Sequence, residues 1–179
     1  MEQQTTDKGV YAPAILEFVT VAAEFCKTLE GAVDMPREVF SRVMRGLLPL
    51  LYLKATLLPA VPREDGFNAP AVTEADYDYV RHGVGTLLGA DDDYLDVFVE
   101  DFKYADQPVL CTVSESLADA YQSIRNFLEA YRHANGEAMA IAVDEVREDF
   151  IGNWGQCVLG ALRVLHLLHF EATTQNGED

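Results

Sequence analysis

Hydrophobic side chains recur every three or four residues along most of the chain, a spacing typical of amphipathic helices. The clearest case has one apolar stripe, from Ile15 to Leu29, and charged or hydroxyl side chains on the opposite face. Nothing along the chain alternates as a half-buried strand does. The pattern therefore predicts an all-α protein, with long helices over residues 12–29, 36–58, 73–89, 112–131 and 135–170.

Capping residues support these boundaries. Thr73 with Asp76, and Thr112 with Glu115, have the spacing of a capping box, in which two side chains satisfy the free N–H groups of a first helical turn. Gly89 follows the third long helix and is expected to end it. Pro36 and Gly31 similarly predict the start of the second helix and the end of the first.

Proline and glycine predict interruptions of the helical pattern. Pro49 lies inside the second helix, where it removes a backbone hydrogen bond and should kink the helix. Residues 59–72 read as the one long loop. The acidic turn at 91–93 should start a short helix, and Gly152 and Gly155 should bend the long last helix. The apolar side of that short helix would carry Tyr94, Val97, Phe98 and Phe102.

Taken together, the pattern predicts a single compact irregular bundle of about six helices. At 179 residues, the chain is long enough to bury a real core without disulfides or metals. We expect one domain over residues 1–179, with an ordered core of about 10–172 and frayed termini.

Composition narrows the classes of function. The net charge is −17, a field that repels nucleic acid and anionic membrane surfaces. Residues 63–106 hold twelve acidic against three basic residues, which indicates either a solvated face or a surface for a basic partner. The three cysteines are far apart, and the N-terminus has no secretory signal, so a cytoplasmic location is expected. No apolar run is long enough to span a membrane.

The common catalytic motifs are absent from the sequence. There is no glycine-rich dinucleotide or phosphate loop, no Gly-x-Ser-x-Gly and no His-Glu-x-x-His. The Glu-x-x-His pairs of di-iron helical bundles are also missing. These absences favour a binding or regulatory protein without a cofactor over an enzyme.

Two pairs of carboxylates support an alternative function, that of an enzyme. Glu115 and Asp119, and likewise Glu145 and Asp149, are four residues apart on predicted helices. Two acids on each of two helices can share a hard cation, as in all-α nucleotide pyrophosphatases. The alternative function is therefore a magnesium-dependent phosphohydrolase with these four ligands. Ordinary solvated acidic faces would give the same spacing.

The last helix holds polar side chains in an otherwise apolar context. Trp154 is predicted to face the core. Asp149, Gln156 and Arg163 are seven residues apart and should form one column, with His166 at its edge. Large apolar residues flank this column, so we expect it to face an enclosed site and the partner of Arg163 to come from elsewhere.

Several blocks resemble a known family. FVTVAAEFC, LLPLLYLKATLLP, DFKYADQPV, TVSESLADAYQSIRNFLEAYR and NWGQCVLGALRVLH are similar to blocks of a bacterial domain-of-unknown-function family of small all-helical proteins. The family implies no activity, cofactor or partner. Its implied pattern includes Glu115, Asp119, Tyr121, Gln122, Trp154, Gly155, Gln156, Arg163 and His166.

These observations lead us to expect a cytoplasmic small-ligand-binding or regulatory protein. Its ligand would be a small anion, or its partner a basic protein. Lys54 joins the candidates because its head group leaves the middle of an apolar stripe, so it must reach solvent, pair with an acid or lower its pKa. The candidate ligand-binding residues are Lys54, Tyr121, Gln122, Trp154, Gln156, Arg163 and His166.

Overall fold

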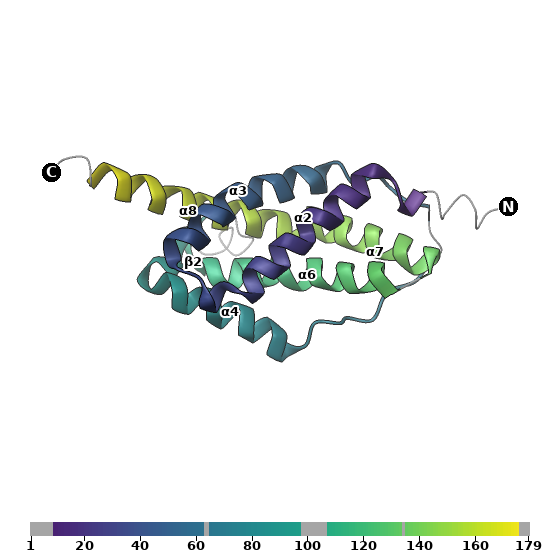
Figure 1. Cartoon of the computed structure of the whole chain (residues 1–179), viewed down its shortest axis with the longest axis horizontal. Helices are drawn as coiled ribbons and strands as arrows, with labels where there is room; N and C mark the ends of the chain where they lie inside the picture. Colours follow the sequence, from purple (N-terminus) through teal and green to yellow (C-terminus); the bar gives the residue numbers. More distant parts are fainter. Residues whose placement is uncertain (1–8, 63–64, 98–106, 134, 176–179) are drawn as a thin grey trace.

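The structure is a computed structural model, and it describes residues 9–62, 65–97, 107–133 and 135–175. Long α-helices pack side by side into a compact bundle (Figure 1), which confirms the predicted all-α class. These helices are α2 (Pro13–Glu30), α3 (Arg37–Thr56), α4 (Glu74–Leu88), α6 (Val113–His133), α7 (Gly136–Asp149) and α8 (Gly155–Gln175). None of the helices in the described ranges is both long enough and apolar enough to cross a bilayer.

Helix α6 is the centre of the bundle. It packs against α2, α4, α7 and α8, while α3 packs on α2 and α8. The C-terminal part of α8 extends beyond the other helices (Figure 1). Pro49 lies inside α3, which continues through it to Thr56.

Each helix buries its apolar stripe in one continuous core. Phe18 of α2, Phe40 of α3 and Ile124 of α6 are fully buried, as the helical spacing predicts. Trp154 is also fully buried, between the rings of Phe18 and Phe150. Its indole N–H donates to the carbonyl oxygen of Val146 at 3.0 Å. The predicted core position of Trp154 is therefore confirmed.

The predicted helix caps are present. At the start of α4, the Thr73 hydroxyl accepts from the Asp76 N–H, and the Asp76 carboxylate accepts from the Thr73 N–H, which completes the capping box. At the start of α6, Thr112 Oγ1 accepts from the Glu115 N–H at 3.1 Å. Gly89 ends α4 with φ of 60°, a left-handed conformation that favours glycine.

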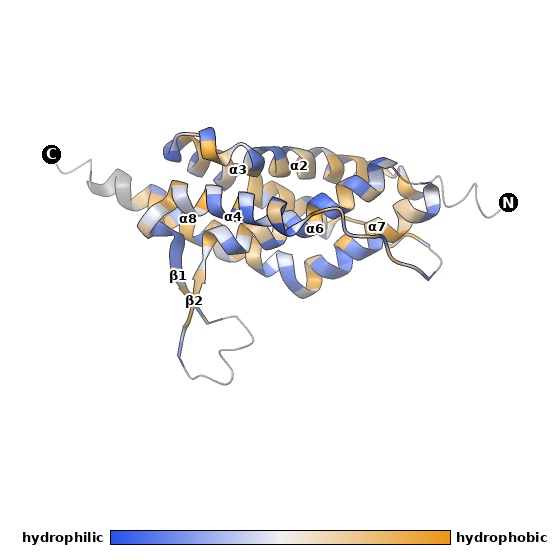
Figure 2. Cartoon of the chain, turned by 90° about the horizontal axis from the view of Figure 1, so that it is seen from below, coloured by the Kyte–Doolittle hydropathy of each residue, from blue (hydrophilic) through white to orange (hydrophobic). Residues whose placement is uncertain are grey.

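The helix predicted after residues 91–93 is wrong. Strand β1 (Asp93–Asp96) instead pairs antiparallel with β2 (Val109–Thr112), and this ribbon projects from the bundle (Figure 2). The short 3-10 turn η2 (Gly89–Asp92) precedes it, and the buried Asp92 carboxylate accepts from the Ser114 N–H and hydroxyl. These two bonds tie the ribbon to the start of α6. The expected helix positions Phe98 and Phe102 lie outside the described residues.

The long last helix is interrupted by a π-helical segment, η3 (Phe150–Trp154), between α7 and α8. A Cβ atom on Gly155 would lie 2.5 Å from the carbonyl oxygen of Phe150, so this close approach requires glycine. A π turn holds one extra residue, which rotates the side chains that follow by about 100° relative to a continuous α-helix. The predicted column of Asp149, Gln156 and Arg163 is therefore wrong, because Asp149 lies before the π turn and the other two lie after it.

Candidate functional site

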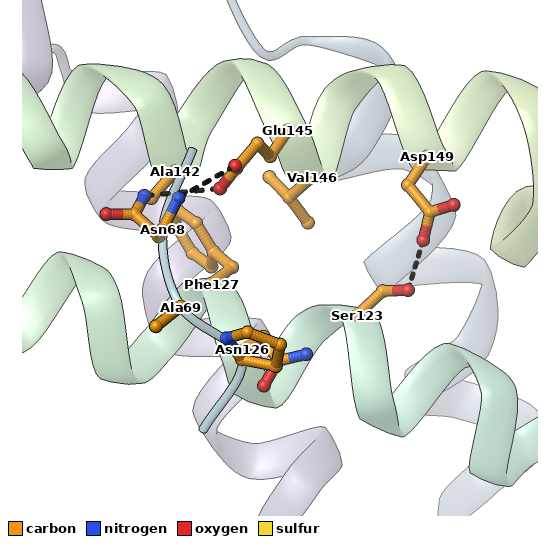
Figure 3. Close-up of a pocket in the computed structure, with 10 residues that line it drawn as sticks. Asn68, Ala69, Ser123, Asn126, Phe127, Ala142, Glu145, Val146 and Asp149 are labelled. Carbon is orange, nitrogen blue, oxygen red and sulfur yellow. Dashed lines mark hydrogen bonds between the residues drawn. The ribbon is translucent and has the colours of Figure 1, made fainter. Parts of the chain in front are cut away.

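A cavity lies between α6 and α7, and Glu145 and Asp149 line it (Figure 3). Its volume is about 220 Å³. The remaining lining comes from α6, from α7 and from the loop that leads to α4. The full lining is Asn68, Ala69, Pro70, Ser123, Asn126, Phe127, Ala142, Glu145, Val146 and Asp149. We call this space the α6–α7 cavity.

The loop before α4 crosses one side of the cavity, and we call its residues 68–72 the strap. Asn68 anchors the strap to α7. Its backbone N–H donates to Glu145 Oε1 at 3.0 Å, and its side-chain amide donates to Glu145 Oε2 at 3.2 Å and to the Ala138 carbonyl at 3.1 Å. Both carboxylate oxygens of Glu145 therefore accept a bond from a neutral donor.

Asn126 anchors the strap to α6. Its Oδ1 atom accepts from the backbone N–H groups of Ala71 and Val72, each at 2.8 Å. One carboxamide thus satisfies two adjacent backbone donors of a segment that has no regular secondary structure. The strap is held to both helices by side chains.

The cavity has polar ends and an apolar floor. The Ser123 hydroxyl donates to the Asp149 carboxylate at one end, and Asn68 binds Glu145 at the other (Figure 3). Val146 is buried between the two carboxylates, and Phe127 is buried below them. Among the described residues, those that line the cavity include two carboxylates and no basic side chain.

The other predicted carboxylate pair lies outside this lining. Asp119 of α6 is half-buried and accepts from the Tyr77 hydroxyl at 2.8 Å. Burial raises the pKa of Asp119, the Tyr77 hydrogen bond lowers it, and the negative charges of Glu115 and Asp149 raise it further. Glu115 is exposed. In the described part of the chain, no three His, Cys, Asp or Glu residues are grouped so as to hold a metal ion, so the predicted four-carboxylate magnesium set is not assembled.

A second, larger cavity of about 490 Å³ is lined by the other end of the strap, at Ala71 and Val72. Tyr121 is buried there and donates its hydroxyl to Glu30 Oε1 at 2.9 Å; burial and this bond both raise the Tyr121 pKa. Arg125 Nη2 lies 2.9 Å from Glu129 Oε1, and its Nε lies 3.6 Å from Glu30. The full lining is Glu30, Ala71, Val72, Asp76, Tyr79, Tyr121, Arg125 and Glu129.

The polar residues predicted on the last helix do not enclose a site. Gln156, Arg163 and His166 are exposed on α8, so the prediction of a closed polar face is wrong. The expectation that Arg163 takes its partner from another segment is confirmed. Its Nη2 donates to the Leu95 carbonyl at 3.3 Å and lies 3.7 Å from Asp96, both in β1. The partly exposed guanidinium fastens the ribbon to α8.

The remaining candidates are dispersed. Lys54 donates to Glu17 Oε2 at 2.6 Å, which pairs α3 with α2. Gln122 is exposed and lines neither cavity, and Trp154 is sealed in the core. Of the seven candidate ligand-binding residues, only Tyr121 lines either cavity. Of the four candidate metal ligands, Glu145 and Asp149 line the α6–α7 cavity.

Sequence reasoning missed Asn68, Ser123 and Asn126. Ser123 lies four residues after Asp119 on the same predicted helix, so its position on the acidic face was available from the spacing. Asn68 is 77 residues from Glu145, and no local pattern connects them. That Asn68 anchors the strap to α7 is evident only from the path of the strap in the structure.

Comparisons with known proteins give the family. The crystal structure of protein BF1032 from Bacteroides fragilis, a structural genomics target, has a similar fold with a TM-score of 0.79. It is 35% identical, and the match covers 89% of this chain and 94% of that chain. No curated protein matches the chain. A family model described as a domain of unknown function, DUF5063, matches residues 10–171. The chain therefore belongs to the DUF5063 family of domains of unknown function, as its sequence blocks predicted.

Proposed function

We propose that this protein is a cytoplasmic, non-enzymatic binding protein whose α6–α7 cavity takes a small organic cation. One observation carries the proposal: the cavity is lined by Glu145 and Asp149, and none of the described residues in its lining is basic. Among the described residues, neither carboxylate forms an ion pair with a basic side chain. Their charge is therefore available to a ligand.

The surroundings strengthen the attraction for a cation. Field lines converge in a concave site with apolar walls, and the net charge of −17 raises the local concentration of cations. Each ionised carboxylate has about four lone-pair sites, so the bonds from Ser123 and Asn68 leave room for further donors. A volume of about 220 Å³ lies below the range of drug-sized pockets, which favours a small ligand.

The anionic ligand expected from the sequence has less support. It depended on Arg163 facing an enclosed space, whereas this side chain is partly exposed and lies against β1. A basic protein partner on the acidic segment 64–106 stays a separate proposal, since part of that segment lies outside the described residues. The three cysteines are unpaired, which supports a reducing, cytoplasmic location.

The magnesium-dependent hydrolase is kept as an alternative with a distinct test. Glu145 and Asp149 could hold one hydrated divalent cation in the same cavity, because magnesium usually binds one or two carboxylates and keeps several waters. An organic cation would also use the apolar floor formed by Phe127 and Val146, whereas a hydrated metal ion would not.

The test measures binding by calorimetry and thermal melting with three probes: butylamine, 1-butanol and magnesium chloride. A ligand that binds only the native state raises the melting temperature by mass action. Butylamine should bind and butanol should not, because only the amine supplies a charge. Asp149→Asn should weaken binding, and Glu148→Gln should not, since Glu148 is exposed on the same helix and outside the lining.

Two outcomes would contradict the proposal. A melting temperature that responds to magnesium and not to amines would favour the hydrolase. Equal responses of wild type, Asp149→Asn and Glu148→Gln to butylamine would show that the amine binds only the general acidic surface.

A further inference from the structure

We infer that the ligand of the α6–α7 cavity carries two cationic groups joined by a short aliphatic chain, as in an α,ω-diaminoalkane. This inference rests on the proposed function and specifies its ligand class. The features that carry it are the spacing of the two carboxylates, the apolar floor between them and the balance of charge.

The two carboxylates are one helical turn apart. Glu145 and Asp149 are four residues apart on α7, so their backbone positions are about 6 Å apart along the helix axis. Glu145 points toward Asn68 of the strap, Asp149 points toward Ser123 of α6, and Val146 lies between them (Figure 3). Asn68 holds the Glu145 carboxylate at one end of the cavity and Ser123 holds that of Asp149 at the other, so an organic ligand that contacts both directly needs two donor groups separated by several atoms.

The space between the carboxylates suits methylene groups. Val146 and Phe127 are buried, and Ala142 completes the apolar part of the lining. An aliphatic chain that lies on this floor removes apolar surface from water, which is favourable. A ligand with hydroxyl groups along the chain would bury polar groups on this apolar floor without partners.

The charge of the lining selects the ends of the ligand. Glu145 and Asp149 supply two negative charges, and their present donors, Asn68 and Ser123, are neutral. A monoamine pairs with one carboxylate and leaves the second without a cation. A diamine supplies one positive charge for each of the two carboxylates. An amino acid such as lysine adds a carboxylate, and the part of the lining that the structure describes has no basic residue to receive it.

The strap limits the length of the ligand. Asn68, Ala69 and Pro70 close one side of the cavity, and the strap is bonded to both helices. A short chain spans two carboxylates whose backbone positions are about 6 Å apart along the helix axis, whereas a long one must fold back to place both ammonium groups on them. We therefore expect 1,4-diaminobutane to bind more tightly than 1,8-diaminooctane.

The experiment compares butylamine, 1,4-diaminobutane, 1,8-diaminooctane, 1,5-diaminopentane and lysine by calorimetry at physiological ionic strength. 1,4-Diaminobutane should bind about tenfold or more tightly than butylamine, since it forms a second charge-assisted contact. Lysine should bind more weakly than 1,5-diaminopentane, which differs only by the carboxylate. Glu145→Gln and Asp149→Asn should each reduce the preference for the diamine over butylamine to near one, and Glu148→Gln should leave it unchanged.

The outcomes separate this inference from the proposed function. If butylamine and 1,4-diaminobutane bind wild type equally well, the diamine inference is overturned and the cation-binding proposal stands. If no amine binds, both are overturned. A diamine preference that persists in Glu145→Gln and Asp149→Asn would also overturn the inference, because the second ammonium would then contact another part of the surface. The comparison of butylamine with 1,4-diaminobutane uses the wild-type protein alone, so it does not depend on whether the variants fold.

Discussion

Replacing Asn126 by alanine should loosen the strap that closes the α6–α7 cavity. The Asn126 carboxamide is half-buried on α6, and its oxygen is the acceptor for the N–H groups of Ala71 and Val72. Alanine removes this acceptor and leaves both donors to solvent. The other anchor, Asn68 on Glu145, stays in place.

The magnitude follows from the two bonds of 2.8 Å. Each contributes about 0.5–1.5 kcal/mol to stability, so Asn126→Ala should cost about 1–3 kcal/mol. For a domain of this size, that corresponds to a fall in melting temperature of about 2–12 °C. If the loss is confined to local opening, the exchange of the two amides accelerates by about 5- to 150-fold.

Amide hydrogen exchange measured by NMR checks this directly. The Ala71 and Val72 amides should exchange faster in Asn126→Ala, whereas the Val84 amide in the buried face of α4 should change little. Asn126→Asp keeps an acceptor oxygen at the same position and should retain most of the protection. Unchanged exchange at Ala71 and Val72 in Asn126→Ala would refute the anchoring role of Asn126.

Three further predictions concern the surrounding fold. Trp154→Ala should destabilise the protein by about 3–5 kcal/mol through a core cavity, and a solvent-like emission maximum of the native tryptophan would contradict its burial. Because burial raises the pKa of Asp119, the native state holds that proton more tightly than the unfolded chain. Wild type should therefore gain stability relative to Asp119→Asn as pH falls from about 7 to 4.5, and urea unfolding with no such trend would be inconsistent with this. Lys54→Met should change stability by less than about 1 kcal/mol and leave amine binding unchanged, since its partner Glu17 is exposed; weakened binding would return Lys54 to the site.

The helices were predictable because each has a strong local signal. The apolar stripe of α2 and the Thr73 cap of α4 depend on residues within a few positions of one another. The ribbon was not predictable in the same way. Asp93–Asp96 is too short to show alternation, and it becomes a strand because Val109–Thr112 supplies a backbone ladder from outside the local window.

The break in the last helix was only half predictable. Glycines at 152 and 155 indicated a bend, but the π-helical register at 150–154 depends on the close approach of Gly155 to the Phe150 carbonyl. This change of register determines which side chains share a helix face with Asp149. It removes Asp149 from the polar face of α8, where continuous α-helical geometry placed it.

The candidate site was predictable to the extent that it lies on one helix. The spacing of Glu145 and Asp149 identified two carboxylates on one face, and both line the α6–α7 cavity. The strap and the α6 side chains that complete the cavity come from distant parts of the chain, so periodicity could not reveal them. Because the described lining residues include two carboxylates and no basic side chain, the proposed ligand is a cation, whereas the sequence led us to expect an anion.

The most direct test of the account is an NMR titration of the labelled protein with 1,4-diaminobutane. The proposed binding site predicts saturable shift changes concentrated on the amides of Ser123, Asn126, Val146 and Asp149, with smaller changes in the strap. Glu148→Gln should reproduce these changes, and Asp149→Asn should need a higher diamine concentration to reach them. Small, non-saturating changes spread over the acidic residues of α4 and β1 would contradict a site in the α6–α7 cavity.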